Sequence, residues 1–218
     1  MGFFGFFKKT KRVVRLIDKL VDTSEYKDYS PEWKYNKAKD LFDNNDSDLW
    51  ISLLKESADA NYGPAQYELG NMLIKGEELK KDYSLGFEYL SKAADNKIPE
   101  ACYDLAYLYQ NGFGCTQSYE KAFVLYKKSA DAGFVDAVHQ VGAFYYEGLV
   151  VSKDEKEAIK WFKKAANRDF VPSLIVLGNI YYNEENDKES FNMLQKAAEL
   201  GSGEAKELLN DEVYDQFR

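Results

Sequence analysis

The sequence predicts an all-α protein built as a solenoid of about five helix-hairpin repeats. Alanine recurs every 36 residues, at Ala58, Ala94, Ala130 and Ala166, and a further step of 32 residues reaches Ala198. A fixed period of this length is typical of arrays in which each repeat packs on its neighbours. Apolar residues within the repeats follow helical spacing, and the four prolines all fall where first helical turns are expected.

The first helix of each repeat, here called helix A, carries an apolar stripe. In the first full repeat the stripe consists of Ala65, Leu69, Gly70, Met72 and Leu73, and equivalent apolar or small residues follow 36 residues later in each of the next three repeats. At about 100° per residue these positions share one helix face. The small residue within the stripe is expected to let the paired helix approach closely, despite its cost to the helix.

Glycine is predicted to end helix A, at Gly76, Gly112 and Gly148, because a left-handed C-terminal cap favours this residue. In the last repeat the loop has lost four residues and its glycine, and reads Asn183-Glu184-Glu185-Asn186 instead.

The second helix, helix B, follows the loop. It is expected to begin near Ser84, Glu120 and Lys156 in the three repeats that keep the full loop. Residues 204–217 are predicted to form a C-terminal cap. The predicted organisation is therefore a basic, Phe-rich segment over residues 1–29 and a repeat solenoid with a C-terminal capping helix over residues 30–218.

The net charge of −8 argues against a nucleic-acid partner, because phosphate binding requires a basic surface. The charge is uneven, since residues 1–20 carry +5 and the remaining 198 residues carry −13. Cys102 and Cys115 are expected near opposite ends of one helix, beyond disulfide distance, which indicates two thiols in a reducing compartment. No apolar run approaches the roughly 20 residues needed to span a bilayer, and a cytoplasmic location is expected.

The N-terminal segment allows three interpretations. Its phenylalanines precede a basic stretch, and such a segment can lie in a membrane interface on anionic lipid, which would place the protein at the inner membrane face. The residues of this possible membrane contact are Phe3, Phe4, Phe6, Phe7, Lys8, Lys9, Lys11 and Arg12. Alternatively the segment caps the exposed core of the first repeat, as every array requires, or serves as a disordered or partner-binding arm.

Each repeat follows the pattern A-x-x-x-L-G-x-x-Y-x-x-G, a variable loop, and K-A-x-x-W/Y-x-x-K-A-A. The residues that carry it are Leu177-Gly178 with Tyr181, Gly112-Phe113-Gly114-Cys115, Lys121-Ala122 with Tyr126, and Trp161 with Lys164-Ala165-Ala166. This pattern resembles the Sel-one-like repeat family, a relative of the tetratricopeptide repeats, over residues 64–203. Lys97 and Asp169 stand where the family usually has glycine. The resemblance implies a right-handed superhelix of helix pairs that serves as a scaffold for protein complexes.

A partner surface is predicted on the side of helix A opposite the apolar stripe. Stacking would align twelve positions there in three ladders, none of which contains a charged residue. The ladders are Tyr67, Tyr103, His139 and Ile175; then Asn71, Tyr107, Ala143 and Asn179; then Ile74, Gln110, Tyr146 and Tyr182. Aromatic and amide side chains of this kind concentrate binding energy. The alternative is that these side chains pack against each other or beneath residues 1–30.

No constellation of residues predicts catalysis or a metal site. His139 is the only histidine, and with two scattered cysteines it supplies neither zinc ligands nor a nucleophile–base pair. We therefore expect a protein that is not an enzyme and that takes no cofactor, metal or small-molecule substrate.

The predicted function is to bind a protein or peptide on the concave helix A surface, as an adaptor, regulator or inhibitor. One alternative is a membrane-surface scaffold anchored by the N-terminal segment. Another follows from the resemblance, because its bacterial members include immunity proteins that neutralise toxins.

Overall fold

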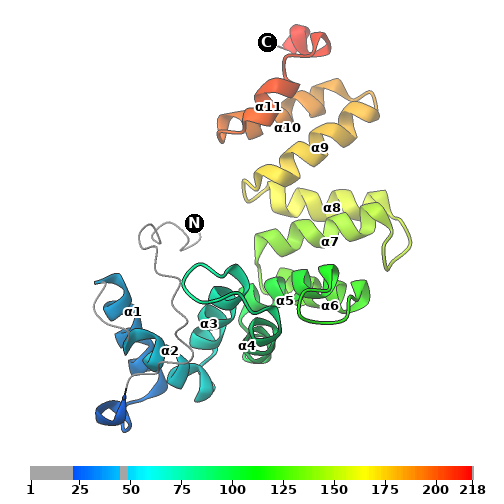
Figure 1. The fold of residues 1–218 in the computed structure, drawn as a ribbon. Helices are drawn as coiled ribbons and strands as arrows, with labels where there is room; N and C mark the ends of the chain where they lie inside the picture. The colour runs from blue at the N-terminus through cyan, green and yellow to red at the C-terminus, as the bar shows by residue number, and fades with distance from the viewer. Residues whose placement is uncertain (1–21, 45–48, 218) are drawn as a thin grey trace. The chain divides into compact units, whose positions relative to one another are not determined.

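The protein is all-α over the residues that the structure describes. The computed structural model describes residues 22–44 and 49–217. Its elements, in chain order, are η1 (Ser24–Tyr26), α1 (Pro31–Asp43), α2 (Leu49–Asp59), α3 (Gly63–Lys75), α4 (Tyr83–Asp95), α5 (Pro99–Asn111), α6 (Tyr119–Asp131), α7 (Val135–Glu147), α8 (Glu155–Ala166), α9 (Val171–Asn183), α10 (Asp187–Glu199), α11 (Gly203–Leu208) and η2 (Glu212–Phe217). This helical content confirms the predicted fold class (Figure 1).

Consecutive helices pack as hairpins, as the repeat period predicts. α1 pairs with α2, α3 with α4, α7 with α8, and α9 with α10. α5 and α6 are joined through Tyr126, whose hydroxyl donates to Gln110 Oε1 at 2.8 Å. The described part of the chain thus holds five hairpins, in which α1, α3, α5, α7 and α9 are the A helices and α2, α4, α6, α8 and α10 the B helices.

The two helices of a hairpin approach each other most closely at the small residue of helix A. A Cβ added to Gly70 would lie 2.9 Å from the Leu90 side chain, and one added to Gly142 would lie 2.8 Å from the Phe162 ring. A larger residue would therefore push helix B outward. This geometry accounts for glycine in the middle of a helix, where it ordinarily costs about 1 kcal/mol.

Helix B begins one residue earlier than the sequence suggested in three hairpins. The preceding residue caps the helix, because its side-chain oxygen accepts a hydrogen bond from the backbone N–H three residues further on, at 3.0, 3.2 and 2.9 Å. These capping residues are Asp82 before α4, Ser118 before α6 and Asp154 before α8. Such caps stabilise a helix by about 1 kcal/mol each.

The predicted glycines do end helix A. Gly76, Gly112 and Gly148 follow the last helical residue with φ angles of 72°, 71° and 72°. α9 ends differently, because Glu185 takes the left-handed conformation with φ of 59° and the Asn186 N–H donates to the Tyr181 carbonyl at 2.9 Å. The shortened last hairpin therefore closes with a tight turn.

The connections between hairpins use the same kind of tight turn. After α4, Lys97 has φ of 63° and the Ile98 N–H donates to the Ala93 carbonyl at 3.2 Å. The residues in the left-handed conformation at this position of the successive repeats are Asn61, Lys97, Gly133, Asp169 and Gly201. Two of the five are glycine, and Asn61 and Asp169 are of the residue types that tolerate this conformation, so the backbone strain is greatest at Lys97.

The chain divides into two compact units, each with its own core. The first extends to Ala101 and also includes Gly112–Thr116, while the second contains Cys102–Asn111 and the chain from Gln117 onward. The segment Gly112–Thr116 belongs to the first unit because it packs on the start of α4, where the Phe113 ring stacks on Tyr83 at 5.0 Å between centroids.

Residues 23–33 pack on the first hairpin. The rings of Tyr29 and Trp33 stack at 4.0 Å between centroids, and the Thr23 hydroxyl donates to the Glu56 carboxylate. Glu56 also forms an ion pair with the buried Lys34, at 2.7 Å. The start of the described chain is therefore fixed to α1 and α2.

The C-terminal residues cover the last hairpin. Tyr214 of η2 is buried, and its hydroxyl lies 2.7 Å from Ser190 Oγ of α10. The Ser190 hydroxyl donates to the Gly178 carbonyl at 2.8 Å, so Tyr214 is the donor towards Ser190. Ala205 of α11 is also buried. α11 and η2 therefore pack against the last hairpin through Ala205 and Tyr214.

Candidate functional site

The A helices of the second unit lie beside one another. Gln140 of α7 lies close enough to the Tyr103 hydroxyl of α5 to act on its pKa, and the Tyr103 ring contacts Phe134, the residue before α7. His139 Nδ1 of α7 lies 2.9 Å from Ser173 Oγ at the start of α9. We call the sides of α5, α7 and α9 that turn away from their B helices the helix-A face.

The first predicted ladder packs between helices and does not stand open on this face. The Tyr103 ring contacts Tyr126 and Phe134, with centroids 5.5 and 5.2 Å apart. Ile175 is only 7% exposed, and Tyr67 of α3 is half-buried. In the second unit, Tyr103 and Ile175 therefore pack at the base of the helix-A face.

His139 occupies the same packed position one repeat later. Its ring contacts Phe162 and Phe170, with centroids 5.2 and 5.5 Å apart. Burial lowers the pKa of His139 below its ordinary value, because the charged imidazolium would lose its water there. The only histidine is thus a packing residue whose Nδ1 joins α7 to Ser173.

The second predicted ladder lies further outward. Tyr107 is 47% exposed, and Asn179 is exposed on α9. Asn71 of α3 and Ala143 of α7 are half-buried. The exposed ring of Tyr107 offers a large contact area with a polar hydroxyl at its end, as aromatic residues at interfaces do.

The third predicted ladder is mixed. Tyr182 is 43% exposed, and its hydroxyl lies 3.4 Å from Asp211 Oδ2, whose negative charge raises the pKa of Tyr182. Gln110 and Ile74 are half-buried, and Gln110 accepts the hydrogen bond from Tyr126. Tyr146 is half-buried beneath the ammonium group of Lys153, which lies 5.2 Å from the ring centroid.

Several polar residues of the helix-A face lie outside the predicted ladders. Asp104 and Asn111 flank Tyr107 on α5 at helical spacing, and Gln140 and Glu147 hold the equivalent positions on α7. Asn183 is the exposed counterpart on α9. On α5 the polar stripe runs along positions 104, 107 and 111, whereas the predicted ladders used positions 103, 107 and 110. The signal available in the sequence was that charged and amide residues recur at these positions.

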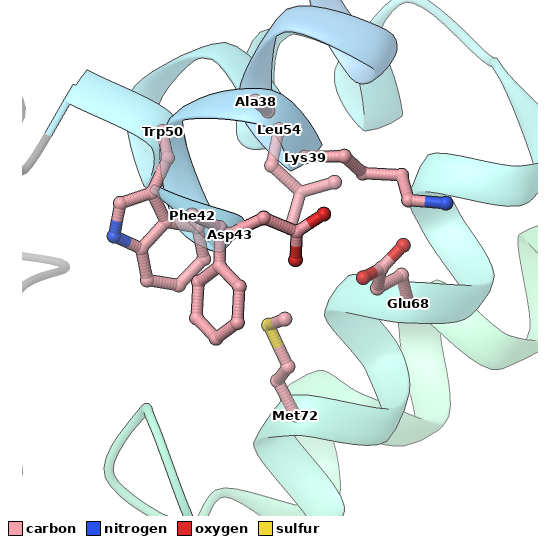
Figure 2. A pocket seen from close by; sticks show the side chains of 8 residues that line it. All are labelled: Ala38, Lys39, Phe42, Asp43, Trp50, Leu54, Glu68 and Met72. Atoms are coloured by element: carbon pink, nitrogen blue, oxygen red, sulfur yellow. The ribbon is translucent and has the colours of Figure 1, made fainter. Parts of the chain in front are cut away.

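The first unit carries a small pocket between α1, α2 and α3 (Figure 2). It is lined by Phe42, Trp50 and Met72, with the Glu68 carboxylate at one side. Burial raises the pKa of Glu68. The pocket measures about 20 Å³, room for about one water molecule, and a second pocket beside Leu69 and Tyr89 measures about 30 Å³. Neither is of the size that binds a small molecule.

The remaining predictions concern metal ligands, cysteines and membrane contact. Within the described ranges, no three His, Cys, Asp or Glu side chains are grouped as metal ligands. Cys102 is buried, and no disulfide joins it to Cys115. No helix among the described residues combines the length and apolarity needed to cross a membrane. The predicted membrane contacts between Phe3 and Arg12 lie outside the described residues.

Comparison with protein families identifies the repeat. The model of the Sel1 repeat matches residues 63–97, 99–134, 135–170 and 175–202. No curated protein sequence matches the chain significantly.

Solved structures show the same fold. A Sel1 repeat protein from Oxalobacter formigenes is 25% identical, with a TM-score of 0.73 over 85% of this chain and 81% of that one. A putative sel1 repeat protein from Klebsiella pneumoniae is 18% identical, with a TM-score of 0.53 over 86% and 97% of the two chains. The immunity protein Pa5087 from Pseudomonas aeruginosa is 25% identical, with a TM-score of 0.52, and the match spans 67% of this chain and 56% of that protein.

Proposed function

Because the chain belongs to the Sel1 repeat family, whose repeats generally form non-catalytic scaffolds for protein interaction, we propose that it binds a partner protein or peptide on its helix-A face. The observation that carries the proposal is the exposure of Tyr107 and Tyr182 among the amide side chains of the same face. Exposed tyrosines supply a large contact area with little side-chain entropy to lose, and they are enriched among residues that dominate binding energy.

The packing beneath these tyrosines supports the proposal. Tyr103 and His139 hold neighbouring A helices together through direct contacts, so the exposed side chains stand on a fixed support. A rigid support reduces the entropy lost on binding. The small pockets of the first unit offer no competing site for a small-molecule substrate.

The test is capture of the partner from an extract of cells that carry the gene, followed by mass spectrometry. Replacing Tyr107 and Tyr182 with alanine is expected to weaken capture by at least about tenfold, because a residue central to binding contributes about 2 kcal/mol or more. The matched control replaces Tyr119 and Val124 of α6, which are exposed in the same unit but on a B helix. Equal capture by the Tyr107/Tyr182 variant and the control variant would refute the proposal.

A second candidate function is that of a toxin-neutralising immunity protein. It is favoured by the 25% identity to the immunity protein from Pseudomonas aeruginosa, over about two thirds of this chain. This role is a special case of partner binding, in which the captured protein is a toxin. Expression of the neighbouring genes with and without this chain tests it, since protection of the host cells is expected if the role is correct. Host cells that grow equally well in both cases would exclude it.

A further inference from the structure

Charge is separated between the two helix layers of the second unit. α5, α7 and α9 contain no lysine or arginine, but they carry Asp104, Asp136 and Glu147. The B helices differ, since α6, α8 and α10 contain three, four and two lysines. The A helices of this unit therefore contribute carboxylates and amides, and no lysine or arginine, to the helix-A face.

The carboxylates lie close to the tyrosines. Asp104 and Tyr107 are three residues apart on α5, which places them on one side of the helix. The pKa of Tyr103 is raised, chiefly by burial and further by the negative charges of Asp136 and Asp104. Both carboxylates are therefore near enough to the Tyr103 hydroxyl to act on it, and they set a negative potential at this part of the face.

The chain already places ammonium groups on tyrosines of its A helices. Lys153 lies 5.2 Å from the ring centroid of Tyr146, and Lys121 lies 5.0 Å from that of Tyr109. These contacts come from residues that follow each A helix in the sequence. Tyr107 and Tyr182 present exposed rings of the same type, and each has a carboxylate close by, Asp104 and Asp211. A cation that stacks on an aromatic ring beside a carboxylate gains from both interactions.

We propose that the partner segment bound on the helix-A face is rich in lysine and arginine. Its cations contact the rings of Tyr107 and Tyr182 and pair with Asp104, Asp136 and Glu147. This inference rests on the proposed function and adds the chemistry of the partner. An acidic segment would place like charges against these carboxylates, which opposes binding.

The experiment is a selection from a random peptide library displayed on phage, with the full chain as bait. Binders are kept when they bind the wild-type chain but not the variant in which Tyr107 and Tyr182 are replaced by alanine. The net charge of these face-dependent peptides is then compared with that of the input library. We expect a clear excess of lysine and arginine.

Affinities of the selected peptides are then measured on two charge variants of the same net charge. The first is Asp104→Asn, Asp136→Asn and Glu147→Gln on the helix-A face. The matched control is Glu189→Gln, Glu199→Gln and Glu207→Gln, three exposed carboxylates of α10 and α11. We expect the first variant to weaken binding at least about threefold more than the control, because each partly exposed ion pair contributes up to about 1 kcal/mol.

Each outcome is decisive. Face-dependent peptides without a cationic excess, or equally affected by both charge variants, would overturn this inference while leaving the proposed function intact. The absence of any face-dependent peptide would overturn the proposed function itself. The basic N-terminal segment of the chain is the other possible occupant. A large gain in peptide affinity on replacing Lys8, Lys9, Lys11 and Arg12 with serine in the full chain would assign the face to that segment and overturn the inference.

Discussion

Replacement of Gly114 by alanine is expected to destabilise the first unit strongly. Gly114 has φ of +72°, and an added Cβ would lie 2.2 Å from the Tyr83 carbonyl oxygen. A left-handed backbone costs alanine about 1 to 2 kcal/mol. A clash with a backbone oxygen cannot be relieved by changing a rotamer, so the segment Gly112–Thr116 must move away from α4.

The displaced segment also loses a ring contact. Phe113 stacks on Tyr83 at 5.0 Å between centroids, and such pairs contribute about 0.5 to 1.5 kcal/mol. Together with the backbone strain, we expect Gly114→Ala to lower the free energy of unfolding by about 1.5 to 3.5 kcal/mol. Urea unfolding followed by circular dichroism measures this change.

Two other glycines separate the contributions. Gly201 has φ of +97° and no atom within 4 Å of an added Cβ, so alanine there tests strain alone. Gly203 begins α11 with an ordinary φ and equally open surroundings, so alanine there is expected to be neutral or slightly stabilising. If Gly114→Ala costs no more than Gly201→Ala, the close contact with Tyr83 does not hold the segment, and the reasoning is wrong.

Three further predictions concern single side chains. Lys97→Gly is expected to raise the free energy of unfolding by about 1 kcal/mol, because Lys97 has φ of 63° and glycine adopts this conformation without strain. An unchanged midpoint of urea unfolding would contradict this. Ser190→Ala is expected to lower the free energy of unfolding by about 1 to 3 kcal/mol, because it breaks the buried hydroxyl pair with Tyr214. A protease is then expected to cut the chain near Tyr214 more readily, and a fully resistant C-terminus would contradict this. Burial lowers the pKa of His139, so stability is fully present above about pH 6.5 and falls as the pH drops below it towards the lowered pKa. In His139→Gln, the free energy of unfolding is expected to depend less steeply on pH across this range. An equally steep pH dependence in the variant and the wild-type protein would show that His139 is not its source.

The helical repeats could be predicted because each hairpin needs small or apolar residues at the same buried positions. The positions equivalent to Ala65 are alanine or serine in four hairpins, and all four residues are buried. The period identifies such positions without knowledge of any contact. The first hairpin was harder to detect, since the charged Lys34 occupies a buried position whose counterparts in later repeats include Cys102, Val138 and Leu174.

The candidate site was less predictable because it depends on the rotation of each A helix. The ladder of Tyr103 and His139 is uncharged and aromatic. Buried positions between packed helices have the same composition, so the sequence does not distinguish a binding surface from a packed one here. The contacts of these two side chains with Phe134 and Phe170 come from residues 31 positions further along the chain. Spacing within one helix does not reveal such a contact, whereas Tyr107 lies only four residues beyond Tyr103 and is exposed.

Comparison of equivalent positions within the chain shows where the repeats are free to differ. Ser173 and its three alanine counterparts scarcely vary, because each fits between packed helices. The position of Tyr107 reads Asn71, Tyr107, Ala143 and Asn179 in successive repeats, and it becomes polar, aromatic or small without altering the hairpin. Side chains that packing does not determine are the ones available to specify a partner. The fold alone would accept lysine at the same exposed positions, so the carboxylates and tyrosines of the helix-A face are the residues through which the proposed binding is best tested.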